Sequence, residues 1–305
     1  MGRFLLHRLL RALLVVAGVS LISFAILFWT GDPATLLIGE DWTEAEVAAF
    51  RHRMGFDRPW YLQYIDFVSK AVRGDFGESL RHGQPSFGLI LERLPATLEL
   101  ALAALFLSIV VAFPAGILSA TRRNGPVDYS CMGFALLGQS IPVFWLGLML
   151  ILVFGVQLRW FPVSGRGTLA HLVLPAIALG SYSIARNARI VRSSLLEVLR
   201  HDYVTTARSK GLAEALVIHR HALRNALIPV VTIIGLEFGH LLGGAVIIET
   251  VFAWPGVGRL MIQAVYSKDF PLVQASVTVT ALIFVTLNIV VDLLYSVLDP
   301  RVRIS

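Results

Sequence analysis

The fold is decided by residues 193–229, which read SSLLEVLRHDYVTTARSKGLAEALVIHRHALRNALIP. Apolar residues recur at helical spacing in both halves: Leu195, Leu196, Leu199 and Tyr203, then Leu216, Val217 and Leu223. The polar side carries four basic residues: Arg208, Lys210, Arg220 and Arg224. Gly211 separates the halves, and a glycine permits a backbone turn that other residues resist. The stretch therefore predicts two short amphipathic helices joined by a turn at Gly211.

Such a segment is too polar to enter lipid and too apolar to stay free in water. We expect it to lie in a groove of another protein, as amphipathic helices commonly do. The alternative is a helix pair that lies on anionic lipid headgroups. Apolar stretches long enough to cross a bilayer lie on either side of it, so the segment is expected at a membrane surface.

The whole composition points to a membrane protein. Apolar residues make up 56% of the 305 positions, charged residues make up 15%, and the mean hydropathy is +0.73. Globular domains carry about 25% charged residues, and a helix needs about 20 apolar residues to cross the hydrocarbon core. Six stretches meet that length, at about 12–30, 98–120, 132–156, 172–191, 227–248 and 273–298. We predict an all-α integral membrane protein with six transmembrane helices, of which the second is interrupted by Pro114 and the third by Pro142.

The first apolar stretch has the basic flank of a secretory signal, but it is longer than the 7–15 apolar residues of a signal's core. No small-residue cleavage site follows it, so it is expected to be a retained helix. Basic residues flank the spans alternately and are concentrated before the first span, after the second, between the fourth and fifth, and after the sixth. By the positive-inside rule, both termini and both basic loops are cytoplasmic.

Residues 31–97 form the expected external region, between a first helix in residues 1–30 and a membrane core in residues 98–305. Thr43 and Glu46 have the spacing of a capping box, and Gly55 is placed to end that helix. A second helix is expected between Pro59 and Gly74. Whether this region is a structural cap or a docking surface for a delivery protein stays open.

Several functions are excluded by what the chain lacks. The net charge is +6, but the basic residues flank apolar segments and do not form the basic stripe of a nucleic-acid-binding surface. No phosphate-binding loop is present, so the chain is not expected to bind ATP. No nucleophile elbow or zinc-protease motif is present either, and we expect no enzyme. The single cysteine, Cys131, offers no metal cluster, and His219 and His221 point to different sides of a helix.

Ionisable residues inside the spans are costly in lipid and are candidates for function. Glu237 and His240 share a face of the fifth span. They are predicted to line the translocation path of a transporter, or else to pair with each other or with a neighbouring helix. Asp292 lies near the cytoplasmic end of the sixth span, where structural pairing is expected.

The stretch Asp202-Tyr203-Val204-Thr205-Thr206-Ala207-Arg208-Ser209-Lys210-Gly211-Leu212, followed by His221-Ala222-Leu223-Arg224-Asn225-Ala226-Leu227-Ile228-Pro229, resembles the cytoplasmic coupling loop of ABC importer permeases. Ala207 and Gly211 match the second alanine and the glycine of that motif, whereas Thr205 stands at its acidic position. The long gap between Gly211 and Pro229 is usual in the dipeptide and oligopeptide permease family.

Shorter matches to that family extend along the chain. They are Gly31-Asp32-Pro33, Gly55-Phe56-Asp57-Arg58-Pro59, Gly74-Asp75-Phe76-Gly77-Glu78-Ser79, Leu94-Pro95-Ala96-Thr97-Leu98-Glu99, Glu249-Thr250-Val251-Phe252-Ala253-Trp254-Pro255-Gly256-Val257-Gly258-Arg259 and Asp299-Pro300-Arg301-Val302-Arg303. Together and in this order they make the resemblance specific.

The resemblance implies the type I ABC importer (MetI-like) permease fold and a place in the bacterial inner membrane. It also implies partners: a second homologous permease, one or two ATPase subunits that hold the ATP and Mg, and a periplasmic substrate-binding protein. Within the coupling loop at 193–226 and just after it, the residues expected to serve the ATPases are Tyr203, Ala207, Arg208, Lys210, Gly211, Leu212, His221, Leu223, Arg224, Asn225 and Pro229.

Peptides, including glutathione, are the solutes that the resemblance favours, and nickel complexes are an alternative. Two other classes of protein stay open at this level. An ion-gradient-driven transporter is disfavoured by the absence of an inverted repeat or of paired broken helices. A membrane-embedded enzyme is disfavoured by the missing catalytic residues.

Overall fold

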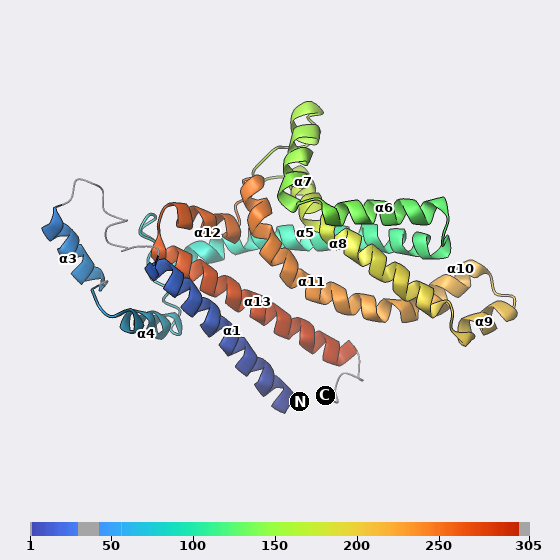
Figure 1. The fold of residues 1–305 in the computed structure, drawn as a ribbon, viewed down its shortest axis with the longest axis horizontal. Helices are drawn as coiled ribbons and strands as arrows, with labels where there is room; N and C mark the ends of the chain where they lie inside the picture. Colours follow the sequence, from blue (N-terminus) through green and yellow to red (C-terminus); the bar gives the residue numbers. More distant parts are fainter. Residues whose placement is uncertain (1, 30–42, 56, 299–305) are drawn as a thin grey trace. The chain divides into compact units, whose positions relative to one another are not determined.

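The computed structural model describes residues 2–29, 43–55 and 57–298, in which the regular elements are helices (Figure 1). The motifs at 31–33 and 299–303 lie outside the described residues, as does Phe56. The chain divides into two compact units. Unit 1 comprises residues 1–96 and 255–305, and unit 2 comprises residues 97–254.

Unit 1 contains two long helices, α1 (Gly2–Trp29) and α13 (Phe270–Leu298), which pack side by side (Figure 1). Its other helices are α3 (Glu44–Met54), α4 (Trp60–Ala71), the beginning of α5 (Ser86–Thr121) and α12 (Val257–Tyr266). A polar contact joins the two long helices, because the Gln274 amide nitrogen donates to the Ser20 carbonyl oxygen at 2.9 Å. The core of this unit centres on Phe76, Ile90 and Leu272, which are almost fully buried.

The two helices predicted in residues 31–97 are present as α3 and α4. At the start of α3, the Thr43 N–H donates to Glu46 Oε2 at 2.9 Å, as the capping box requires. Gly55 ends the helix in the left-handed conformation, with φ of 73°. The second helix begins directly after Pro59 and is tied to α1 by Tyr64, whose hydroxyl lies 2.8 Å from Ser20 Oγ.

Unit 2 is built around α8 (Leu169–Val198), which contacts α6 (Pro126–Ser140), α7 (Val143–Leu150) and α11 (Leu223–Val251). The remaining elements are the π-helical segments η1 (Ile151–Gln157) and η2 (Val217–Ala222) and the short helices α9 (Asp202–Ser209) and α10 (Glu214–Leu216). The end of α5 approaches α8 closely. A Cβ atom on Gly116 would lie 2.7 Å from the Ala188 carbonyl oxygen, and one on Gly180 would lie 3.0 Å from that of Ala104. Small residues at these positions let the backbones meet.

Four described helices are long and apolar enough to cross a membrane, at Arg8–Leu27, Ser86–Thr121, Leu169–Val198 and Phe270–Val291. The third predicted span, at 132–156, is not one straight helix: α6 and the α7–η1 helix that follows meet at 105°, and they count as a fifth span if taken together. The break falls at Pro142, where the preceding Ile141 adopts an extended backbone. Pro114, in contrast, leaves α5 continuous.

The fifth predicted span, at 227–248, lies within α11. Side chains at 228, 231, 232, 235 and 236 of this helix lie outside the described residues, and so does the side chain of Asp292 in α13.

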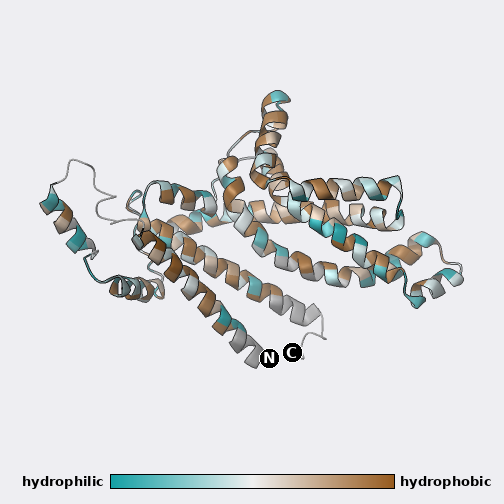
Figure 2. Cartoon of the chain, viewed as in Figure 1, coloured by the Kyte–Doolittle hydropathy of each residue, from teal (hydrophilic) through white to brown (hydrophobic). Residues whose placement is uncertain are grey.

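The surfaces of these helices suit lipid. Only 6% of the α1 span is buried inside the chain, and Leu13 and Leu14 are 68% and 74% exposed. On α5, Phe106 is 69% exposed. Most of α1, α5 and α13 is hydrophobic, whereas hydrophilic residues lie on α3, on the C-terminal half of α8 and on α9 (Figure 2). Exposed apolar side chains of this size and number are expected where the surrounding solvent is a bilayer.

Candidate functional site

The segment predicted to couple to a partner is residues 193–226, from the end of α8 to the beginning of α11. Gly211 adopts the left-handed conformation between α9 and α10, with φ of 76°. Its N–H donates to the Arg208 carbonyl oxygen at 2.9 Å and closes the turn. Nothing lies within 4 Å of the position that a Cβ atom would take. The backbone angle, and not lack of space, therefore requires glycine here, and the predicted turn is confirmed.

The apolar side of this segment packs mainly against the chain itself. A buried cluster contains Ala120, Leu195, Val198, Val204, Ala207, Val217, Ala222 and Ala226, and Ile117, Leu196, Leu199 and Leu212 pack against it. Val204 and Val217, from opposite sides of the turn, have no exposed surface. Part of the groove that the amphipathic pattern demands is thus supplied by the ends of α5, α8 and α11.

Hydrogen bonds join the two halves of this segment. The Asn225 side-chain nitrogen donates to the Tyr203 hydroxyl at 2.8 Å, so two predicted site residues 22 positions apart are brought together. Ser194 Oγ donates to the Ala226 carbonyl oxygen at 2.8 Å and ties α8 to α11. The His201 ring stacks on Tyr203, with ring centroids 5.8 Å apart. The segment is therefore braced at both ends.

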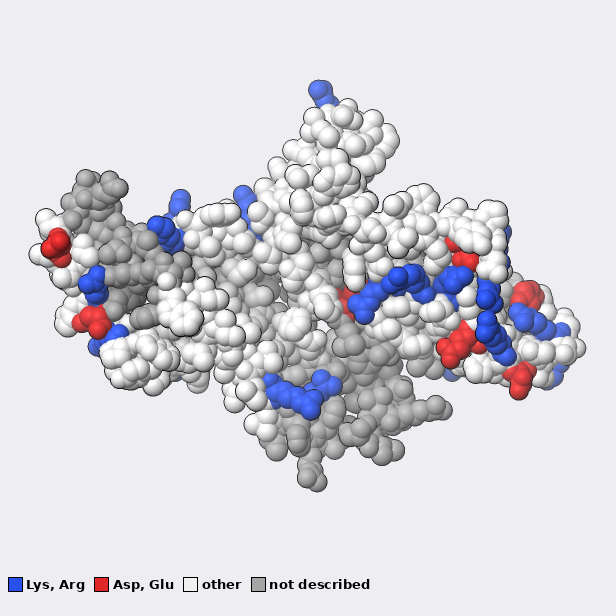
Figure 3. All heavy atoms as spheres, viewed as in Figure 1, with Lys and Arg blue, Asp and Glu red and all other residues white. Residues whose placement is uncertain are grey.

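The outward side of the segment is basic. Lys210, Arg220 and Arg224 are exposed, and Arg208 forms an ion pair with Glu214 at 2.6 Å. The hydrogen bonds from Arg208 lower the pKa of the Glu214 carboxyl. Lys and Arg side chains gather over the C-terminal half of α8 and the α9–α10 end of unit 2, with Asp and Glu side chains among them (Figure 3). This surface can attract a partner with acidic groups.

The remaining predicted coupling residues occupy different environments. Ala207 is buried in the cluster, whereas Leu212, His221 and Leu223 are half-buried. Pro229 lies inside α11 and is exposed, less than one turn beyond the braced segment. The structure thus divides the motif into a packing set and an exposed set led by Tyr203, Lys210 and Arg224.

Sequence reasoning missed a charged contact that supports this segment. Arg192 Nε and Nη2 donate to the two carboxylate oxygens of Asp128, each at 2.7 Å. The hydroxyl of Ser119 also donates to Asp128, and the Asn124 N–H donates at 2.9 Å. The pair joins the first turn of α6 to α8 across 64 positions of sequence. Its only sequence signal was a carboxylate in the first turn of a helix that begins with Pro126.

Glu237 and His240 lie in different environments. Glu237 is 1% exposed and accepts a hydrogen bond from the Asn187 side-chain nitrogen of α8 at 2.5 Å. Asn187 also donates to Ser108 Oγ of α5 at 3.0 Å, whereas His240 is exposed. The side-chain nitrogen of Asn187 in α8 therefore joins α8 to both α5 and α11 inside unit 2. In the described part of the chain, no group of three or more His, Cys, Asp or Glu residues is placed to hold a metal ion.

Two family models match the chain. Residues 112–304 match "Binding-protein-dependent transport system inner membrane component", and residues 1–101 match the N-terminal part of such membrane components. The di/tripeptide transport system permease protein of Pseudomonas aeruginosa is 42% identical, covering 94% of both chains. The dipeptide transport system permease protein of Alkalihalophilus pseudofirmus is 39% identical over 98% of this chain and 99% of the relative. A glutathione transport system permease protein of Escherichia coli is 40% identical over 99% of both chains.

Solved structures show the same fold. The MetNI methionine ABC transporter in an inward-facing conformation aligns with a TM-score of 0.58 at 21% identity, covering 69% of this chain and 96% of the matched chain. An amino acid ABC transporter with histidines aligns with a TM-score of 0.56 at 17% identity, covering 68% and 94%. The family models and these relatives show that the chain belongs to the inner membrane components of binding-protein-dependent transport systems, in the family of the peptide permeases.

Proposed function

We propose that this chain is a permease subunit of an ATP-driven importer and that, with a second homologous permease, it forms the path by which peptides cross the membrane. The observation that carries the proposal is the braced segment 193–226, whose apolar side is packed internally and whose basic side is exposed. The relatives named for dipeptide, tripeptide and glutathione transport support a peptide as the solute.

In the proposed assembly the energy comes from one or two partner ATPases, which hold the ATP and Mg. Tyr203, Lys210 and Arg224 are proposed to contact an ATPase, while the buried cluster transmits its movement to α5, α8 and α11. Closure of the ATPases would move the segment as a rigid lever, and the spans would then change between inward and outward openings. A periplasmic binding protein would deliver the peptide to the outward opening.

The proposed topology has six spans, with α11 as the fifth, and both termini in the cytoplasm of a bacterial cell. The alternating distribution of basic residues supports it. Membrane residues 98–305 form the core of the proposed subunit, and residues 31–97 form its external region.

Glu237 and His240 are proposed to serve the translocation path. His240 is exposed on the surface of unit 2 and available to a solute or a partner permease. Glu237 is closed off by Asn187 in this structure, so it reaches the path only when α8 and α11 separate. Loss of peptide uptake in Glu237→Ala with normal subunit assembly would support this role, and unchanged uptake would contradict it.

The first test of the function is purification of the tagged chain from its native membrane in a mild detergent, followed by identification of the attached proteins. Recovery of a second permease and of ATPases is the expected result. The second test places Gly211→Pro in the assembled transporter, with Gly211→Asn as the matched control. Peptide uptake and peptide-stimulated ATP hydrolysis should be lost only in the proline variant. Purification of the chain alone, under conditions that preserve a known ABC complex, would overturn the importer assignment.

A further inference from the structure

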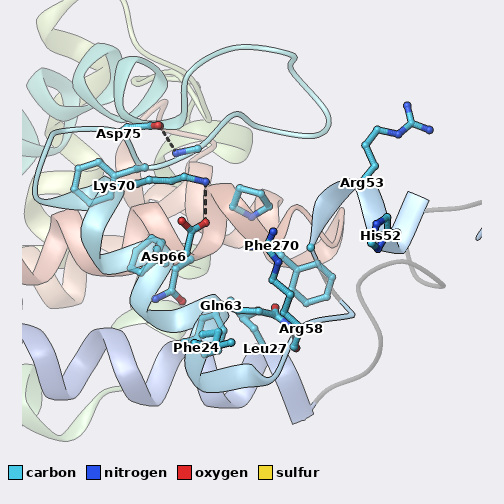
Figure 4. Close-up of a pocket in the computed structure, with 17 residues that line it drawn as sticks. Phe24, Leu27, His52, Arg53, Arg58, Gln63, Asp66, Lys70, Asp75 and Phe270 are labelled. Carbon is cyan, nitrogen blue, oxygen red and sulfur yellow. Dashed lines mark hydrogen bonds and ion pairs between the residues drawn. The ribbon is translucent and has the colours of Figure 1, made fainter. Parts of the chain in front are cut away.

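A cavity of about 370 Å³ lies within unit 1, between α4 and the adjoining ends of α1 and α13 (Figure 4). Its apolar lining comes from Phe24, Leu27, Leu62, Phe67, Phe76, Phe270 and Pro271. Its polar lining includes Arg58, Asp66, Lys70, Asp75 and Gln274. The cavity thus combines an aromatic and aliphatic wall with charged groups, as a site for an amphipathic molecule does.

The lining contains one buried group without a partner. Gln274 is 4% exposed, and its amide nitrogen donates a hydrogen bond to the Ser20 carbonyl oxygen. Its carbonyl oxygen, Oε1, is buried and accepts no hydrogen bond within the described residues. A buried acceptor left unpaired is costly, so this oxygen favours a ligand that carries an O–H or N–H donor.

Of the charged side chains around the cavity, Arg53, Arg58 and Asp75 make no ion pair within the described residues. Asp66 is paired with Lys70 at 2.8 Å, and Asp75 Oδ1 accepts the Gly77 N–H at 2.9 Å, as the dashed lines of Figure 4 show. Arg58 is exposed, makes no ion pair within the described chain, and extends beside Phe270 (Figure 4). Its guanidinium is therefore available to a phosphate or a carboxylate.

The position of the cavity indicates a lipid. Phe24 and Leu27 lie in the last two turns of α1, and Phe270 and Gln274 lie in the first two turns of α13, so the cavity is at one end of two candidate spans. The adjoining α4 exposes Trp60, Tyr61 and Ile65 by 50%, 51% and 60%. Exposed Trp and Tyr on an amphipathic helix are typical of the membrane–water interface.

We infer that this cavity binds the head group and upper acyl chain of an anionic glycerophospholipid with head-group hydroxyls, as phosphatidylglycerol has. Arg58 binds the phosphate, Gln274 Oε1 accepts a hydroxyl proton, and Phe67, Phe76 and Phe270 contact the acyl chain. The place of the cavity at one end of two candidate spans and its aromatic wall favour the lipid over a free peptide, whose ammonium group would turn to Asp75. The inference needs only that the chain is a membrane protein and does not depend on the solute it carries.

The test measures lipid binding to the detergent-purified transporter, with endogenous lipid removed, by native mass spectrometry. Phosphatidylglycerol should bind at least tenfold more tightly to the wild type than to Arg58→Gln, because a charge-assisted contact is lost. Gln274→Met should weaken binding about fivefold. Arg73→Gln, an exposed arginine of the same region that does not line the cavity, is the matched control and should bind as the wild type does.

Three further arms identify the ligand. Phosphatidylcholine lacks a head-group donor and should bind at least tenfold more weakly than phosphatidylglycerol. The same is expected of sn-glycerol 3-phosphate, which lacks acyl chains. A dipeptide should not displace the bound lipid. Equal phosphatidylglycerol binding by the wild type and Arg58→Gln would overturn the inference. Displacement by the dipeptide, or equal binding of phosphatidylcholine, would overturn it as well. Arg58 is exposed, so this variant tests the inference even if Gln274→Met fails to fold.

Discussion

At the scale of single residues, the backbone at position 211 has the clearest consequence. Gly211→Ala should lower the stability of the segment by about 1–2 kcal/mol, because an L-residue in the left-handed conformation is strained. Gly211→Asn should cost less, since asparagine tolerates this conformation, and Gly211→Pro should cost most, since proline cannot reach a φ of 76°. The unfolding temperature of the purified transporter should be highest for the Asn variant, lower for the Ala variant and lowest for the Pro variant. Equal unfolding temperatures for all three would show that the turn carries no strain.

The ion pair between Arg208 and Glu214 is exposed, with 41% and 55% of the two side chains accessible, so its contribution should be small. Glu214→Gln is expected to reduce the free energy of unfolding by less than about 1 kcal/mol at pH 7. The pKa of Glu214 is lowered in the folded state by Arg208, so this stabilisation is present above the ordinary value of 4.5 and is lost as the pH falls through the lowered pKa. The difference between wild type and variant should also shrink at high salt. A difference that grows with salt would contradict this account.

At the scale of helices, the contact between α5 and α8 depends on a missing side chain. A Cβ atom at Gly116 would lie 2.7 Å from the Ala188 carbonyl oxygen and from Val191 Cβ, so Gly116→Ala should destabilise the helix pair by about 1–3 kcal/mol. Gly133 also lies in a helix, but nothing is within 4 Å of its Cβ position. Gly133→Ala is therefore the matched control and should be neutral or stabilising by up to about 1 kcal/mol. Comparison of the two unfolding temperatures checks the prediction, and a more stable Gly116→Ala would refute the close approach.

The contact between α6 and α8 depends on charge. Arg192→Met would leave the Asp128 carboxylate without its bidentate partner, and the side chain of Asp128 is only 4% exposed. The free energy of unfolding should fall by about 3 kcal/mol, which is the lower end of the range for breaking a buried ion pair. The lower end applies because the Arg192 side chain is 25% exposed. The double variant Asp128→Asn, Arg192→Met should recover part of that loss, since the uncompensated charge is gone. Additive losses in the double variant would show that the two residues do not act as a pair.

At the scale of the whole molecule, the proposed six-span topology can be tested with one cysteine at a time. Cys131 is the only cysteine, so Cys131→Ser provides a background without thiols. Val72→Cys and Ser164→Cys, at exposed positions, should react with a membrane-impermeant maleimide added outside intact spheroplasts. Lys210→Cys should react only after the membrane is permeabilised. If Ser164→Cys is reached only from inside, the bent pair of α6 and α7–η1 does not cross the membrane.

The local features of the molecule follow from the sequence by itself. The membrane class follows from apolar length, and the start of α3 from the spacing of Thr43 and Glu46. The turn at Gly211 follows from the freedom of glycine to adopt positive φ. Each of these depends on residues only a few positions apart, whose dihedral limits and hydrogen bonds act whatever the rest of the chain does. Of the prolines at 114 and 142, in contrast, only Pro142 breaks its helix.

The partners of the polar and apolar side chains were decided by the tertiary structure. Glu237 is bonded to Asn187, 50 positions away, although His240 lies on its own helix. Asp128 pairs with Arg192, 64 positions away, and Gln274 reaches the backbone of Ser20, 254 positions away. The apolar face of residues 193–226 is covered largely by other helices of its own unit. The periodicity of the sequence required a cover for this face but did not identify it. Helical periodicity determines which side of a helix needs a partner, but the partner itself depends on how several helices pack together.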